Sequence, residues 1–169
     1  DKSIKGGSLR IDSPGGDSIA SDQIWREMNL LSKKKPLVIS MSDLAASGGY
    51  YIAMSGDPVL AYPGTYTGSI GVVFGKLNLR GLYDKLGIRK EILSRGKNAE
   101  IDTDYRGFTP AERERVLEEM GVIYRDFVQK VADSRRKKWD EIDPLAQGRT
   151  LLGAQARQNG LVDELGSFE

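Results

Sequence analysis

Residues 45–53, Ala-Ala-Ser-Gly-Gly-Tyr-Tyr-Ile-Ala, are the stretch that decides the fold. Small residues surround Ser47 and aromatic residues follow it, a pattern that predicts a strand turning sharply into a helix. The apolar run at residues 37–41 predicts the strand itself. Because a strand that leads into a helix is half of a βαβ unit, the expected fold class is α/β.

An earlier glycine-rich turn, Ser-Pro-Gly-Gly at residues 13–16, follows an expected strand at residues 9–12. Asp17 or Ser18 can cap the next helix, which the lysines and proline at residues 33–36 end. The apolar residues that recur at helical spacing in this helix are Ile24, Met28 and Leu31.

The rest of the chain continues the alternation of strands and helices. Thr109 and Glu112 form a capping-box pattern at the start of the clearest helix, expected at residues 109–136. No repeat or linker is found, so residues 1–169 are expected to form one domain. The other expected elements are strands at residues 59–62, 70–74 and 88–93 and short helices at residues 79–86 and 154–159.

Composition narrows the chemistry. The 169 residues include 25 Lys and Arg, 24 Asp and Glu, and no His or Cys. A net charge of +1 and the lack of a sizeable basic patch argue against a nucleic-acid partner. Disulfides, thiol nucleophiles and imidazole bases are excluded, and no metal or cofactor is expected. No apolar run reaches the roughly 18 residues of a membrane span, so this chain itself is expected to be soluble.

Two junctions suit chemistry, because unpaired backbone N–H groups gather where strands end and helices begin. They are the turn at residues 13–16 and Ser47 with its two following glycines. Alone, the serine would be an ordinary helix cap and the glycines an ordinary turn. Together, a hydroxyl without neighbouring bulk and the backbone N–H groups of Gly15 and Gly16 are what an acyl-transfer site needs.

A reactive serine requires a base, and without histidine the usual substitute is an uncharged lysine. A lysine with the ordinary pKa of about 10.4 is only about 0.04% neutral at pH 7. Its pKa must therefore fall by about three units, which requires an apolar site that excludes water.

Three motifs in order resemble the signal peptide peptidase A family (peptidase family S49), bacterial serine proteases with a Ser-Lys dyad. They are residues 10–16 (RIDSPGG), residues 45–53 and residues 67–72 (TGSIGV). The likeness covers nearly the whole chain and continues to residues 147–149 and 156–163. It implies a fold like that of ClpP and crotonase, a spiral of βαβ units.

The resemblance also implies residue roles. Ser47 is the expected nucleophile, the N–H of Gly16 lines the oxyanion hole together with that of Gly48, and Ser69 orients the base. The implied activity is that of a serine endopeptidase that degrades cleaved signal peptides, which are the expected substrate.

The lysine departs from the pattern of short family members, which carry it in a Gly-x-Tyr-Lys-Asp stretch. Aligning Gly96 with that glycine puts Ala99 at the lysine position, and Ala99 cannot accept a proton. Either the register slips by two and Lys97 is the base, or the base lies outside this chain. Long family members have two tandem domains, with the serine in the C-terminal one. The chain resembles that half, which implies a lysine-bearing N-terminal domain as its partner.

The resemblance further implies a homo-oligomeric ring at the outer face of the bacterial cytoplasmic membrane. Two other functions stay open. One is a non-catalytic assembly domain of the same family, which Ala99 would allow. The other is a crotonase-type acyl-CoA enzyme, which places carboxylates over its thioester and for which Asp43 is the one suitable residue beside Ser47.

Overall fold

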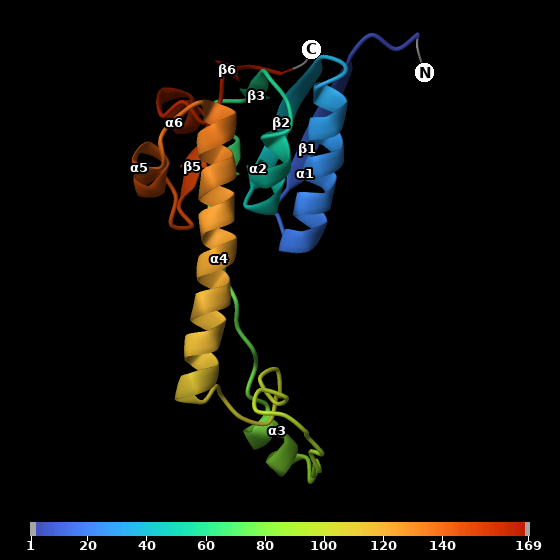
Figure 1. Ribbon diagram of the computed structural model, residues 1–169, viewed down its shortest axis with the longest axis vertical. Coiled ribbons are helices and arrows are strands. Elements are labelled where there is room, and N and C mark those ends of the chain that lie inside the picture. Colours follow the sequence, from blue (N-terminus) through green and yellow to red (C-terminus); the bar gives the residue numbers. More distant parts are fainter. Residues whose placement is uncertain (1–2, 168–169) are drawn as a thin grey trace. The chain divides into compact units, whose positions relative to one another are not determined.

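The computed structural model describes residues 3–167, and the chain is mixed α/β, as its sequence pattern predicts. It divides into two compact units. The first unit holds residues up to Val72 and from Ile123 onward, and the second holds residues 73–122 (Figure 1).

The central strand of the first unit is β2 (Leu37–Ala46), which extends five residues beyond the apolar run that predicts it. It pairs in parallel with β1 (Gly7–Ser13) along one edge. Its other edge is shared by β3 (Val59–Ala61) and then by β4 (Tyr66–Gly68), both parallel to it. One strand thus has two successive partners along the same edge, which produces the curled sheet expected for a ClpP-like and crotonase-like fold.

Two short strands complete the sheet of the described chain. β5 (Thr150–Leu152) pairs antiparallel with β4, and β6 (Glu164–Leu165) pairs parallel with β3. The order is β5-β4-β2-β3-β6, with β1 added at β2. Every pairing that involves β2 is parallel, so the carboxyl ends of β1, β2 and β4 lie at the same edge of the sheet.

Helix α1 (Ser18–Ser32) connects β1 to β2, and Asp17 caps it by accepting a hydrogen bond from the amide of Ala20 (2.7 Å). The prediction of this helix is confirmed, but the residues that face the core are not all those that the apolar spacing predicts. Trp25 and Met28 pack against the core, whereas the two other residues at that spacing are largely exposed. Those residues are Ile24 and Leu31, at 47% and 39% exposure.

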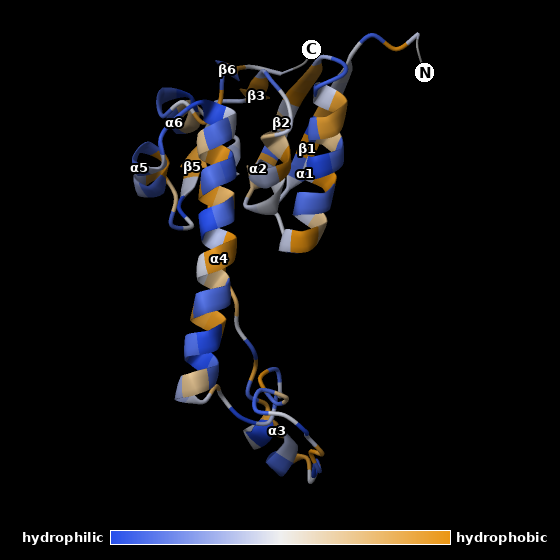
Figure 2. Cartoon of the chain, in the orientation of Figure 1, coloured by the Kyte–Doolittle hydropathy of each residue, from blue (hydrophilic) through white to orange (hydrophobic). Residues whose placement is uncertain are grey.

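The core of the first unit lies between β2 and the helices. Helix α2 (Gly48–Ala53) and the second half of α4 (Pro110–Arg135) contribute to it, with smaller parts from α5 (Trp139–Ile142), the 3-10 turn η1 (Asp143–Leu145) and α6 (Gly153–Gln158). In Figure 2, β2 and α1 carry orange, hydrophobic bands, and blue and orange alternate along α4. The most buried residues of this core include Ile39, Met41, Tyr50, Val59, Ile70, Val128, Val131 and Leu161.

The second unit contains α3 (Arg80–Lys85) and the first half of α4. The strands expected at residues 70–74 and 88–93 are wrong: neither range has strand structure. Apolar residues form a strand only where an edge is available to pair with, and Val73 and Leu93 are instead about nine-tenths exposed. Within residues 73–122, Glu112 and Val116 are the buried side chains, so packing alone does not hold this unit together.

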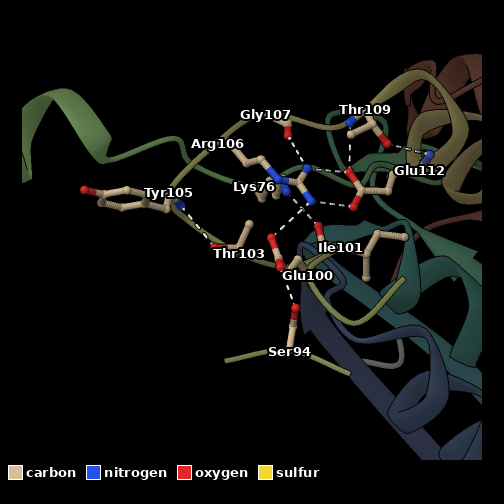
Figure 3. Close-up of polar contacts among 10 residues, drawn as sticks. All are labelled: Lys76, Ser94, Glu100, Ile101, Thr103, Tyr105, Arg106, Gly107, Thr109 and Glu112. Carbon is tan, nitrogen blue, oxygen red and sulfur yellow. Dashed lines mark hydrogen bonds and ion pairs between the residues drawn. The ribbon is translucent and has the colours of Figure 1, made fainter. Parts of the chain in front are cut away.

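Polar contacts join several segments of the second unit (Figure 3). Arg106 binds both oxygens of Glu112, at 2.7 and 2.8 Å. The carboxylate also accepts from the amide of Thr109 (2.8 Å), and the Thr109 hydroxyl accepts from the amide of Glu112 (3.2 Å). The capping box predicted at the start of the long helix is therefore confirmed. Lys76 adds a bond to the carbonyl of Ile101 (2.7 Å).

Candidate active site

Ser47 occupies the sharp bend between β2 and α2. Its backbone has φ 52° and ψ −119°, a conformation that L residues rarely adopt and that costs on the order of 1–3 kcal/mol. Its amide donates to the carbonyl of Gly68 (2.9 Å), and its carbonyl accepts from the amide of Tyr51 (2.8 Å). The side chain caps no helix N–H and is partly exposed. A strained strand-to-helix turn that presents a hydroxyl is typical of a nucleophile.

The turn after β1 packs directly against this bend. A Cβ on Gly15 would lie 2.5 Å from the amide nitrogen of Gly48 and 2.7 Å from the Cβ of Ser47. Gly15 also has φ +97°, which a side chain would strain. Because the backbone of this turn touches the bend, Gly15 is required by both space and conformation.

The two glycines after Ser47 make room for two different neighbours. A Cβ on Gly48 would lie 2.4 Å from the hydroxyl oxygen of Ser21 on α1 and 3.3 Å from the amide nitrogen of Gly16. A Cβ on Gly49 would lie 2.6 Å from the carbonyl oxygen of Ser13. The Gly-Gly pair therefore lets β1 and α1 approach the start of α2.

The amides of Gly16 and Gly48 are the donors that the sequence predicts for an oxyanion hole. Among residues 3–167, neither amide donates a hydrogen bond to another protein group. Unpaired N–H groups next to a nucleophile can stabilise negative charge on a carbonyl oxygen, which is worth roughly 3–4 kcal/mol per donor in acyl transfer.

Ser69 follows β4 as Ser47 follows β2. The preceding residues, Gly68 and Ala46, are directly paired across the two strands. Ser69 has φ 49°, and its amide donates to the carbonyl of Arg149 (2.7 Å). The structure thus brings Gly16, Ser47 and Ser69 to the carboxyl ends of three neighbouring parallel strands, where sites in such sheets form.

In the described part of the first unit, no lysine is hydrogen-bonded to Ser47. Lys97 belongs to the second unit and lies exposed on a turn. Lys130 of α4 is engaged in ion pairs, with its ammonium 2.6 Å from Asp126 and 3.5 Å from Asp22. Asp43, the carboxylate considered for acyl-CoA chemistry, is exposed on β2.

A cluster around Tyr51 was not predicted from the sequence. The Tyr51 hydroxyl donates to Asp22 of α1 (2.6 Å) and lies 3.1 Å from Asp126 of α4. Lys130 closes the cluster through Asp126. The spacing of Asp126 and Lys130, four residues apart on a helix, is the one local signal that pointed to it. The contacts of Tyr51 join residues 29 and 75 positions apart, which periodicity cannot reveal.

The described residues contain no group of three or more Asp, Glu, His or Cys side chains arranged to hold a metal ion. In the same part of the chain, no helix combines the length and the apolar character needed to cross a membrane.

Comparison with known proteins identifies a matching family and several similar proteins. The model of Peptidase family S49 matches residues 29–169. Over 99% of its length the chain is 46% identical to "Serine protease SPPA, chloroplastic" of Arabidopsis thaliana, of which it covers 25%. It is 36% identical to "Protease 4" of Salmonella typhi and 37% identical to "Protease 4" of Haemophilus influenzae, over 100% and 99% of the chain. It covers 27% of each Protease 4, so the chain spans about a quarter of the length of these relatives.

Proposed function

The chain belongs to peptidase family S49, and we propose that it is the serine-bearing part of a Ser-Lys peptidase that degrades cleaved signal peptides. One observation carries the proposal. The strained bend at Ser47 presents a hydroxyl next to the unengaged amides of Gly16 and Gly48, at the carboxyl ends of parallel strands. A relative named a serine protease, 46% identical over almost the whole chain, supports the same assignment.

The proposed reaction is acyl transfer through a serine ester. The Ser47 oxygen attacks the peptide carbonyl while a neutral lysine takes its proton, and the carbonyl oxygen becomes an anion between the Gly16 and Gly48 amides. The peptide nitrogen then leaves with the proton from the lysine. Water, deprotonated by the same lysine, hydrolyses the ester and restores Ser47.

The base is proposed to come from another domain of the whole protein. Aligning Gly96 with the glycine of the short family members puts Ala99 at the lysine position. Lys97 lies on an exposed turn, whereas a lysine base requires an apolar site that excludes water. Ser69, at the end of β4 beside β2, is proposed to orient the incoming amine. A lysine-bearing N-terminal domain and a ring of subunits at the outer face of a membrane complete the proposal.

Hydrolysis of a peptide ester tests this assignment in the full-length protein. Ser47→Ala should lower kcat by at least about 1,000-fold, because the nucleophile is lost. Ser32→Ala is the matched control, since Ser32 ends α1 and its hydroxyl donates to the carbonyl of Asn29 in the same helix. Lys97→Ala should leave kcat unchanged, and the 169-residue chain alone should be inactive.

Three results would count against parts of the proposal. Unchanged activity in Ser47→Ala would refute the nucleophile. Loss of activity in Lys97→Ala, together with turnover by the isolated chain, would place the base at Lys97. An inactive full-length protein would favour a non-catalytic assembly domain.

A further inference from the structure

The two amides next to Ser47 lie at the starts of different helices. Gly16 immediately precedes Asp17, the residue that caps α1, whereas Gly48 is the first residue of α2. The distance between the two N–H groups therefore depends on how α1 and α2 are held together. Ser21 of α1 already touches the start of α2, because its hydroxyl oxygen lies 2.4 Å from where a Cβ on Gly48 would be.

Tyr51 makes the polar link between these helices. Its own amide donates to the carbonyl of Ser47, so its backbone is part of the nucleophile turn. Its ring is 6% exposed and packs edge-on against Trp25 of α1, with 6.1 Å between ring centres. Its hydroxyl donates to Asp22, one turn before Trp25 on the same helix (2.6 Å).

A second carboxylate contacts the same hydroxyl from a different helix. Asp126 of α4 lies 3.1 Å from it, and Lys130 bonds both Asp126 oxygens at 2.6 and 2.7 Å. Burial, the hydrogen bond to Asp22 and the two carboxylate charges all raise the pKa of Tyr51, so the phenol keeps its proton at neutral pH. One hydroxyl thus joins α2 to α1 through Asp22 and lies beside α4 at Asp126.

We propose that the Tyr51–Asp22 hydrogen bond is a positioning device that sets the spacing of the Gly16 and Gly48 amides. This inference rests on the proposed function, because it assigns those amides to the oxyanion. Donors of this kind act on charge that exists only in the transition state. Loosening their spacing therefore lowers kcat and leaves KM nearly unchanged.

The structure supplies a matched pair of variants. Asp22 and Asp126 contact the same hydroxyl and are 47% and 55% exposed, but only Asp22 lies on α1. In the full-length protein with a peptide-ester substrate, Tyr51→Phe and Asp22→Ala should each lower kcat by roughly 10- to 100-fold, with KM within about twofold of wild type. Asp126→Ala should change kcat by less than about threefold. Asp22→Asn keeps an acceptor oxygen and should restore most of kcat.

Two further measurements separate positioning from stability. The double variant Tyr51→Phe/Asp22→Ala should be little slower than either single variant, because each change already removes the Tyr51–Asp22 bond that sets the spacing. Binding of a peptide boronic acid, which forms a tetrahedral adduct with the serine, should weaken by the same factor as kcat. A merely structural role would instead lower the melting temperature of all three single variants and leave kcat at 25 °C unchanged.

Wild-type kcat in folded Tyr51→Phe would overturn the inference, as would an equal loss in Asp22→Ala and Asp126→Ala. Either result leaves the proposed function standing if Ser47→Ala is inactive. If wild type and Ser47→Ala hydrolyse the ester equally, the proposed function fails and this inference fails with it.

Discussion

Ser47 occupies a backbone conformation that glycine would adopt more easily. At φ 52° and ψ −119° it has the angles of the first central residue of a type II′ turn, a position that glycine dominates. The chain keeps a serine there, with both of its backbone groups hydrogen-bonded. Strain of this kind, held by its surroundings, is typical of functional residues.

Replacing Ser47 should expose this strain in the unfolding free energy. Ser47→Gly is expected to be more stable than Ser47→Ala by about 1 kcal/mol. Relief of roughly 1–3 kcal/mol of backbone strain outweighs the 0.5–1 kcal/mol entropy cost of glycine. Both variants lack the hydroxyl, so the difference between their unfolding free energies in urea reports the backbone conformation alone. A Ser47→Ala protein as stable as Ser47→Gly would show that the bend is unstrained.

Gly15 should be far less replaceable than a glycine on an open turn. Gly15→Ala puts a methyl group within 2.7 Å of the Gly48 amide nitrogen and the Ser47 Cβ, at a backbone φ of +97°. It is therefore expected to destabilise the fold by about 3 kcal/mol. Gly64→Ala is the control, because a Cβ there meets nothing within 4 Å and should change stability by less than about 0.5 kcal/mol. Equal urea midpoints for the two variants would contradict the close packing of the bend.

At the scale of elements, helices were predictable because their signals are local. Asp17 at the start of α1 and the Thr109–Glu112 box of α4 are both found as predicted. The short strands were less predictable, because pairing with a distant edge decides them. β4 (Tyr66–Gly68) exists because β2 offers it an edge, whereas the more apolar residues 70–74 have none.

The stability that the first turn of α4 contributes should depend on the protonation of Glu112. Its hydrogen bonds to Arg106 and to the Thr109 backbone lower the pKa of the Glu112 carboxyl from 4.5 to about 2. A lowered folded-state pKa means that the carboxylate stabilises the fold above about pH 4.5 and that this stabilisation is lost as the pH falls toward 2. Wild type should therefore exceed Glu112→Gln in stability at pH 6, and the difference should vanish near pH 2.

Urea unfolding followed by far-UV circular dichroism measures this difference at each pH. In an Arg106→Gln background, the pH-dependent difference should shrink, because the main cause of the lowered pKa is removed. A difference between wild type and Glu112→Gln that stays constant from pH 6 to pH 2 would rule out the assigned role of the ion pair.

For the whole molecule, the candidate residues of the site are easier to recognise in the sequence than the contacts that support them. Ser47, Gly16, Gly48 and Ser69 stand in short motifs whose glycines and serines are visible in the chain, and the structure places them at the ends of neighbouring strands. The cluster around Tyr51 joins α1, α2 and α4, and only the packed fold brings these helices together. The base was not predictable for a different reason: one alignment with short family members puts Ala99 at the lysine position, and a register shifted by two residues puts Lys97 there.

The most direct test of the central claim is covalent labelling of the full-length protein with a serine-reactive fluorophosphonate, followed by peptide mapping. The predicted result is a single adduct on Ser47, formed faster as the pH rises and a lysine loses its proton, and absent from Ser47→Ala. An adduct on another serine, or none at all in a preparation that hydrolyses peptide esters, would contradict the assignment of Ser47 as the nucleophile.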